Sequence, residues 1–131
     1  MERPKILLAD DEPAVLEGVR RLLEPEFLVI GTAQDGPSLL AAAESLKPDV
    51  IIADISMPVL NGFEAARRLK AACRSTRIIF LTVHEEPVVV SEALGIGVDG
   101  YVIKRSAALD LIPAIRHVLQ GHSYVSPAVQ Q

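Results

Sequence analysis

Residues 49–62, DVIIADISMPVLNG, decide the fold because they join a short apolar run to a charged residue. The apolar residues 50–53 are bounded by turn signals, which is typical of a strand that is buried on both faces. Asp54 follows this run directly, and Asn61-Gly62 closes the loop that comes after it. Because an unpaired carboxylate is costly to bury, Asp54 either caps the strand end or belongs to a site that uses its charge.

Further apolar runs on both sides of this stretch alternate with helical patterns. The expected strands are residues 5–9, 27–32, 50–53, 77–82 and 100–103. Between them, apolar residues recur at spacings of three and four, which indicates amphipathic helices. This alternation predicts an α/β fold: a doubly wound five-stranded parallel sheet with helices on both faces.

The last helix is expected to end near Gln120, before Gly121, but its start is open. If the helix begins at Ser106, Pro113 lies in its interior and should kink it. If Asp110 is the cap, Pro113 falls in the first turn, where proline is tolerated.

Composition limits the classes of function. The 131 residues are 50% apolar and 4% aromatic, which indicates one domain with an aliphatic core. A net charge of −4 argues against a nucleic-acid surface on this chain. The single cysteine, Cys73, excludes an internal disulfide and fits a reducing cytosol. The charged N-terminus is not a signal peptide, and no apolar run approaches the ~20 residues of a membrane helix, so we expect a cytoplasmic protein without membrane contact.

Polar residues end four of the expected strands, namely Asp10-Asp11, Asp54, Thr82 and Lys104. In doubly wound sheets, ligands bind at the carboxyl ends of the strands. Three carboxylates gathered there repel each other unless a cation joins them, and oxygen ligands with room for water suit Mg²⁺. A lysine and a hydroxyl complete the groups that stabilise a phosphoryl group, and a carboxylate among them can form an aspartyl phosphate.

Each of these residues also has an ordinary structural interpretation. Acidic residues favour a helix N-terminus, which is the preferred interpretation of Glu12 and an alternative one for Asp10 and Asp11. Thr82 can be a plain strand residue, and Lys104 a solvated surface lysine. The joint match of four strand ends favours the functional interpretation.

The chain resembles receiver domains of two-component response regulators from about Lys5 to Gly121. The matching motifs are ILLADDEP, DVIIADISMPVLNG, IIFLT and GYVIK, in the family's order and spacing. LTVHEEP and the terminal GHSYVSPAV further resemble the NarL/LuxR subfamily. The proline that follows the lysine in many receivers is absent here, because Arg105-Ser106 follows Lys104.

This resemblance implies roles for individual residues. They are Asp54 as phosphoacceptor, Asp10, Asp11, Asp54 and the backbone carbonyl of Ser56 as Mg²⁺ ligands, Lys104 as phosphate-binding lysine, and Thr82 and Tyr101 as switch residues. Phosphorylation would draw Thr82 toward the phosphoryl group and leave space into which Tyr101 turns inward.

The resemblance also implies the flavodoxin-like strand order 2-1-3-4-5, a domain organisation and partners. Residues 1–122 would form the receiver domain, and residues 123–131 would begin a linker to an effector domain that this chain lacks. We expect a signalling switch that takes its phosphoryl group from a sensor histidine kinase. It would not be an enzyme beyond self-phosphorylation and slow autodephosphorylation at Asp54. The fourth helix, fifth strand and last helix would control the effector and form a homodimer, with DNA bound only by the effector domain.

Other functions stay open at this point. A stand-alone receiver would act through protein–protein interaction, and a receiver-like module without a switch function would never be phosphorylated. A phosphohydrolase resembling haloacid dehalogenases needs a second aspartate two residues after the nucleophile, where this chain has Ser56. A nucleotide-binding domain needs a glycine-rich first turn, where this chain has three acidic residues, Asp10-Asp11-Glu12.

Overall fold

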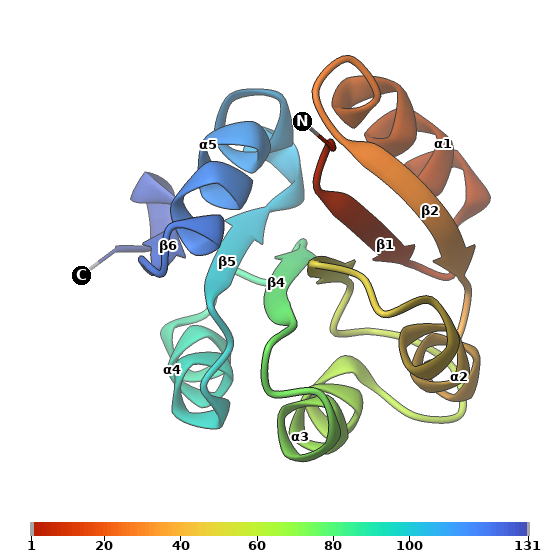
Figure 1. Cartoon of the computed structure of the whole chain (residues 1–131). Helices are drawn as coiled ribbons and strands as arrows, with labels where there is room; N and C mark the ends of the chain where they lie inside the picture. Colours follow the sequence, from red (N-terminus) through yellow and green to blue (C-terminus); the bar gives the residue numbers. More distant parts are fainter. Residues whose placement is uncertain (1, 131) are drawn as a thin grey trace.

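The computed structural model describes residues 2–130 and contains one six-stranded sheet between two layers of helices (Figure 1). The strands are β1 (Lys5–Ala9), β2 (Leu28–Ala33), β3 (Val50–Ala53), β4 (Arg77–Thr82), β5 (Gly100–Ile103) and β6 (Tyr124–Val125). They are all parallel and lie in the order β2-β1-β3-β4-β5-β6, which confirms the predicted doubly wound sheet. The short β6 extends the expected five strands by one at the β5 edge.

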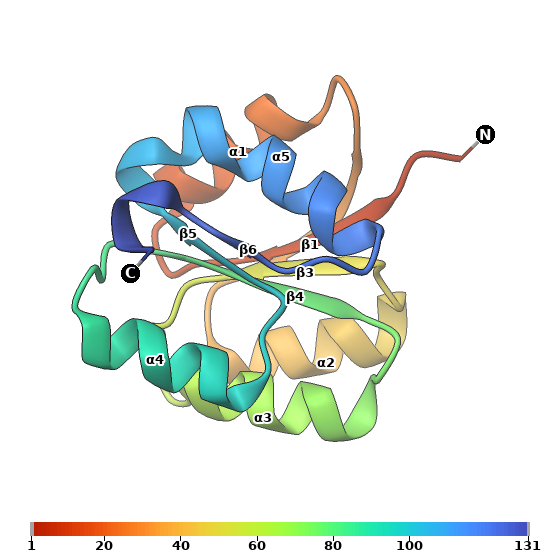
Figure 2. The ribbon, with the colours of Figure 1, turned by 90° about the vertical axis from the view of Figure 1, so that its left-hand side faces the viewer.

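Helices cover both faces of this sheet, as predicted (Figure 2). They are α1 (Pro13–Leu23), α2 (Gly36–Leu46), α3 (Gly62–Ala72), α4 (Pro87–Ile96) and α5 (Ala107–Leu119), with short 3-10 turns η1 (Lys104–Ser106) and η2 (Pro127–Val129). The apolar sides of α1 and α5 pack with one face of the sheet. Those of α2, α3 and α4 pack with the other face. The core therefore consists of two apolar layers, one on each side of the sheet.

The central strands explain why the polar residues meet at one edge. Every residue of β3 is buried, which fits a run of four apolar residues without alternation. The hydrogen-bonded pairing of the strands extends past their ends. The backbone N–H of Asp54 donates to the carbonyl of Ala9 at 3.0 Å. The N–H of Asp10 donates to the carbonyl of Ala33, also at 3.0 Å. The ends of β2, β1 and β3 are thus aligned, and Asp10 and Asp54 leave the sheet side by side.

The structure defines the starts of two helices. α2 begins at Gly36, and the carboxylate of Asp35 caps it by accepting the N–H of Ser38 at 2.7 Å. In the last helix, Asp110 is not the cap, because α5 begins at Ala107. Pro113 therefore lies inside α5, as the first of the two alternatives stated. Among residues 2–130, no helix has both the length and the apolar character needed to cross a membrane.

Candidate functional site

One lysine joins two buried carboxylates at the carboxyl edge of the sheet. Lys104 Nζ lies 2.8 Å from Asp10 Oδ2 and 3.2 Å from Asp54 Oδ2. The three side chains are 15%, 4% and 7% exposed, in that order. They come from the ends of β5, β1 and β3, so only the folded sheet brings them together. A single ammonium group therefore balances two carboxylates that are shielded from water.

Burial and pairing shift the pKa values of this group in predictable directions. Burial raises the pKa of the Asp10 carboxyl, and hydrogen bonds from Lys104 and from the N–H of Glu12 at 2.9 Å offset only part of that rise. Burial alone would lower the pKa of Lys104, but its hydrogen bond to Asp10 and the charge of Asp54 outweigh this, so the pKa is raised. Lys104 is thus held as an ammonium ion between the two acids.

The carboxylates also fit a divalent cation. Within the described residues, Asp54 Oδ1 is buried and accepts no hydrogen bond, so it offers a free ligand atom. Asp10, Asp11 and Glu12 each place a carboxylate oxygen within 4.8 Å of the others. Asp11 and Glu12 are exposed, which leaves room for the waters that Mg²⁺ retains. Glu12 belongs to this acidic group even though its predicted role was only to begin α1.

Gly62 fixes the loop that carries Asp54. Its N–H donates to the carbonyl of Ile55 at 2.7 Å, which folds the loop back onto the start of α3. A Cβ atom at position 62 would lie 2.5 Å from the carbonyl oxygen of Asp54 and 2.7 Å from Cα of Ile55. Both contacts are to backbone, which cannot move aside as a flexible side chain can. Only glycine fits at this position without displacing Asp54.

Gly62→Ala is accordingly expected to lower the free energy of unfolding by about 2 kcal/mol, because overpacked sites cost ~1–3 kcal/mol. Gly18→Ala is the matched control, since Gly18 is exposed on α1 and a Cβ there meets nothing within 4 Å. That control should gain roughly 0.5–1 kcal/mol from better helix propensity. Urea denaturation measures both changes. Equal effects of the two substitutions would contradict the close approach at Gly62.

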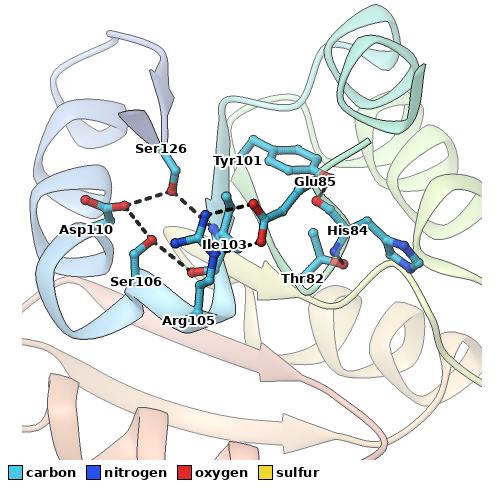
Figure 3. Close-up of polar contacts among 9 residues, drawn as sticks. All are labelled: Thr82, His84, Glu85, Tyr101, Ile103, Arg105, Ser106, Asp110 and Ser126. Carbon is cyan, nitrogen blue, oxygen red and sulfur yellow. Dashed lines mark hydrogen bonds and ion pairs between the residues drawn. The ribbon is translucent and has the colours of Figure 1, made fainter. Parts of the chain in front are cut away.

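Thr82 and Tyr101 are linked through the backbone of His84 (Figure 3). Thr82 is buried at the end of β4, and its Oγ accepts the N–H of His84 at 3.3 Å. The hydroxyl of Tyr101 donates to the carbonyl of His84 at 2.8 Å. Burial raises the pKa of Tyr101 to about 12, so the phenol stays protonated and can donate at neutral pH.

The side chain of Tyr101 points inward in this structure. Its ring is fully buried, and its response to phosphorylation stays a prediction. Ser56 also makes a contact that was not predicted, because its Oγ lies 3.1 Å from His84 Nε2 across the mouth of the site. The residue therefore links the loop after β3 to the loop after β4, in addition to its predicted backbone role.

Two further polar contacts near the site were not predicted (Figure 3). Arg105 forms a bidentate ion pair with Glu85, at 2.7 and 2.8 Å, which ties η1 to the loop before α4. Asp110 on α5 accepts hydrogen bonds from the hydroxyl groups of Ser106 in η1 and of Tyr124 and Ser126 in the C-terminal segment. Only the four-residue spacing of Ser106 and Asp110, which matches neighbours on a helix that begins at Ser106, could have indicated part of this cluster.

A parallel α/β domain in which strand ends bring an acidic pair, a third carboxylate and a lysine together has the architecture of a receiver-type signalling domain. The response regulator receiver domain family matches residues 6–116. The chain belongs to this family. Its relatives place it among NarL/LuxR-type regulators, whose receiver domains act in phosphorylation-dependent two-component signalling and are not conventional enzymes.

Several relatives are similar over nearly the whole chain. The transcriptional regulatory protein DegU of Brevibacillus brevis is 38% identical over 127 residues, which cover 95% of this chain and 54% of DegU. The nitrate/nitrite response regulator NarL of Escherichia coli is 39% identical over 132 residues, which cover 98% of this chain and 60% of NarL. The chain thus spans a little over half the length of these curated relatives.

Solved structures of RcsB are similar to the whole fold. The isolated REC domain of RcsB from Salmonella enterica serovar Typhimurium, in the presence of phosphomimetic BeF₃⁻, has a TM-score of 0.91 at 30% identity. The match covers 98% of this chain and 96% of that one. Two RcsB dimers bound to two parallel DNAs also match, with a TM-score of 0.91, 30% identity, and coverage of 98% of this chain and 66% of RcsB.

Proposed function

We propose that this chain is a phosphorylation switch in which Asp54 accepts a phosphoryl group from a sensor histidine kinase in the cytoplasm. The observation that supports this proposal is the different environment of the two oxygens of the Asp54 carboxylate. One of its oxygens lies 3.2 Å from Lys104 Nζ, and the other is buried without a hydrogen bond among the described residues. A carboxylate that is both oriented by a cation and left with a free oxygen is equipped to act as a nucleophile.

The reaction transfers a phosphoryl group without any change of oxidation state. A carboxylate oxygen of Asp54 forms a bond to phosphorus, the bond from phosphorus to the donor breaks, and the donor leaves with the bonding electron pair. Lys104 and the hydroxyl of Thr82 then stabilise the phosphoryl oxygens. Mg²⁺ bound by Asp10, Asp11, Asp54 and the carbonyl of Ser56 would supply the charge neutralisation that lets the two anions approach.

The proposed output surface consists of α4, β5 and α5. Val88 on α4 is 74% exposed and Leu109 on α5 is 80% exposed, so apolar side chains are available on both helices. The two helices lie on opposite faces of the sheet and flank its β5 edge, so exposed apolar side chains are present on both sides of that edge. We infer that this face forms a homodimer and controls a DNA-binding effector domain in a longer regulator, as the RcsB dimers on DNA suggest by similarity. A stand-alone receiver that acts by protein–protein contact is the alternative.

The test is intact-mass measurement after incubation with a small phosphodonor, with Mg²⁺ in one sample and a chelator in another. The expected result is a gain of one phosphoryl group with Mg²⁺ and none with the chelator. Sizing of the phosphorylated sample then tests the dimer. No gain in either sample would favour a module that is never phosphorylated, and rapid release of free phosphate without accumulation would favour a phosphohydrolase.

A further inference from the structure

Asp110 is a buried carboxylate that serves no predicted role in the phosphorylation site (Figure 3). Its Oδ2 accepts hydrogen bonds from Ser106 Oγ at 2.8 Å and from Ser126 Oγ at 2.9 Å. Its Oδ1 accepts a bond from the hydroxyl of Tyr124 at 3.1 Å. Two of these three donors come from the segment that follows α5. A buried carboxylate has lost its contacts with water and depends on hydrogen bonds from protein donors instead. The loss of one of these donors is therefore costly.

Ser126 connects this carboxylate to the edge of the sheet. Its N–H donates to the carbonyl of Tyr101 at 2.9 Å, and its Oγ accepts the N–H of Ile103 at 3.1 Å. Pro127 begins the 3-10 turn η2, so the chain leaves the edge of the sheet after Ser126. The side chain of Ser126 therefore supplies the acceptor for the last N–H of β5, at the point where β6 has ended. The same hydroxyl donates its proton to Asp110.

The residues of β5 that form hydrogen bonds with Ser126 lie beside residues of the phosphorylation site. Ile103 directly precedes Lys104, whose ammonium group binds Asp54. Tyr101, bonded to Ser126 through its carbonyl, is also bonded to His84 through its hydroxyl. Val125 and Val129 pack against the buried cluster that contains Tyr101. Residues 124–130, here named the C-terminal strap, therefore contact β5, the strand that contains Tyr101 and Ile103.

We propose that Ser126 and Asp110 anchor the C-terminal strap to the end of β5, so that its docking and the state of the phosphorylation site are coupled. A phosphoryl group adds roughly −1.5 to −2 charge on Asp54 and changes the position that Lys104 prefers. Ile103 moves with Lys104, and the bond to Ser126 transmits the change to the strap. Coupling of this kind is reciprocal, so strap docking also alters the stability of the phosphorylated form. This coupling rests on the proposed function, whereas the anchor does not.

Amide hydrogen exchange, read residue by residue by NMR, tests the anchor in unphosphorylated protein. Ser126→Ala should make the Ile103 amide exchange roughly tenfold faster, because its acceptor is lost. Ser123→Ala is the matched control, since it makes the same chemical change at an exposed serine three residues earlier. That control should leave the Ile103 amide unchanged. Equal exchange in wild type and Ser126→Ala would overturn the anchor.

The second arm compares the strap before and after phosphorylation, with the modification checked by intact mass. In wild type and Ser123→Ala, the amides of Tyr124 and Ser126 should change their exchange rates at least threefold on phosphorylation, a change that should vanish in Ser126→Ala. Unchanged strap exchange in fully phosphorylated wild type would overturn the coupling. If no phosphoryl group is gained, the proposed function fails and the coupling fails with it, while the first arm still decides the anchor.

Discussion

Asp54→Asn is expected to abolish the Mg²⁺-dependent phosphoryl gain completely. Asparagine has nearly the same volume, but its amide is not a nucleophile, and it removes the negative charge that faces Lys104 at 3.2 Å. The substitution should leave the fold intact, because it removes one of the carboxylates that repel each other at this edge. Intact mass measures the phosphoryl gain, and circular dichroism measures the fold.

Asp49→Asn provides the control for this prediction. Asp49 precedes β3 at the opposite end of the same strand, where its carboxylate accepts the N–H of Lys5 at 2.7 Å. Its replacement should leave the phosphoryl gain at the wild-type level. A substantial remaining gain in folded Asp54→Asn would mean that another carboxylate is the acceptor.

Lys104→Met is expected to lower the free energy of unfolding by about 3 kcal/mol in the absence of divalent cations. The substitution keeps an unbranched apolar chain but leaves Asp10 and Asp54 buried without their shared counter-charge, and breaking a buried pair costs ~3–5 kcal/mol. Asp10 recovers part of this cost because its raised pKa makes protonation easier. Urea denaturation in a chelating buffer measures the loss.

Lys70→Met is the comparison for Lys104. Lys70 pairs with Asp99 at 3.1 Å, but the side chains are 28% and 18% exposed, and Arg77 lies 3.8 Å from the same carboxylate as a second cation. Its loss should cost at most about 1 kcal/mol. Added Mg²⁺ should stabilise Lys104→Met more than the wild type, because a bound cation replaces the missing charge. Equal losses in the two variants would contradict the account of the site.

The strand ends could be predicted because their signals are local. Short apolar runs that stop at Asp54, Thr82 and Lys104 identify buried parallel strands, and the topology of such sheets then gathers their ends at one edge. Asp10 and Asp54 were predicted to meet Lys104, and the structure brings these three side chains into contact. The roles of these residues in phosphoryl transfer stay predictions until the transfer is measured.

The contacts of the C-terminal strap, which packs against β5 after α5 has ended, could not be predicted. Tyr124 and Val125 form a strand of two residues, too short for any alternating pattern to indicate. The hydrogen bonds of Ser126 to Ile103 and Asp110 arise only after that strand has paired with β5. The inward position of Tyr101 is likewise a choice among side-chain rotamers, which packing decides and the sequence pattern does not.

Chemical location of the phosphoryl group tests the central claim most directly. Borohydride reduces an aspartyl phosphate to homoserine, and peptide mass mapping then identifies the position. We predict that homoserine appears at residue 54 alone, in samples treated with phosphodonor and Mg²⁺, and nowhere when Mg²⁺ is chelated. Homoserine at Asp10 or Asp11, or at none of the three aspartates in a sample that had gained mass, would contradict the assignment of Asp54 as the phosphoacceptor.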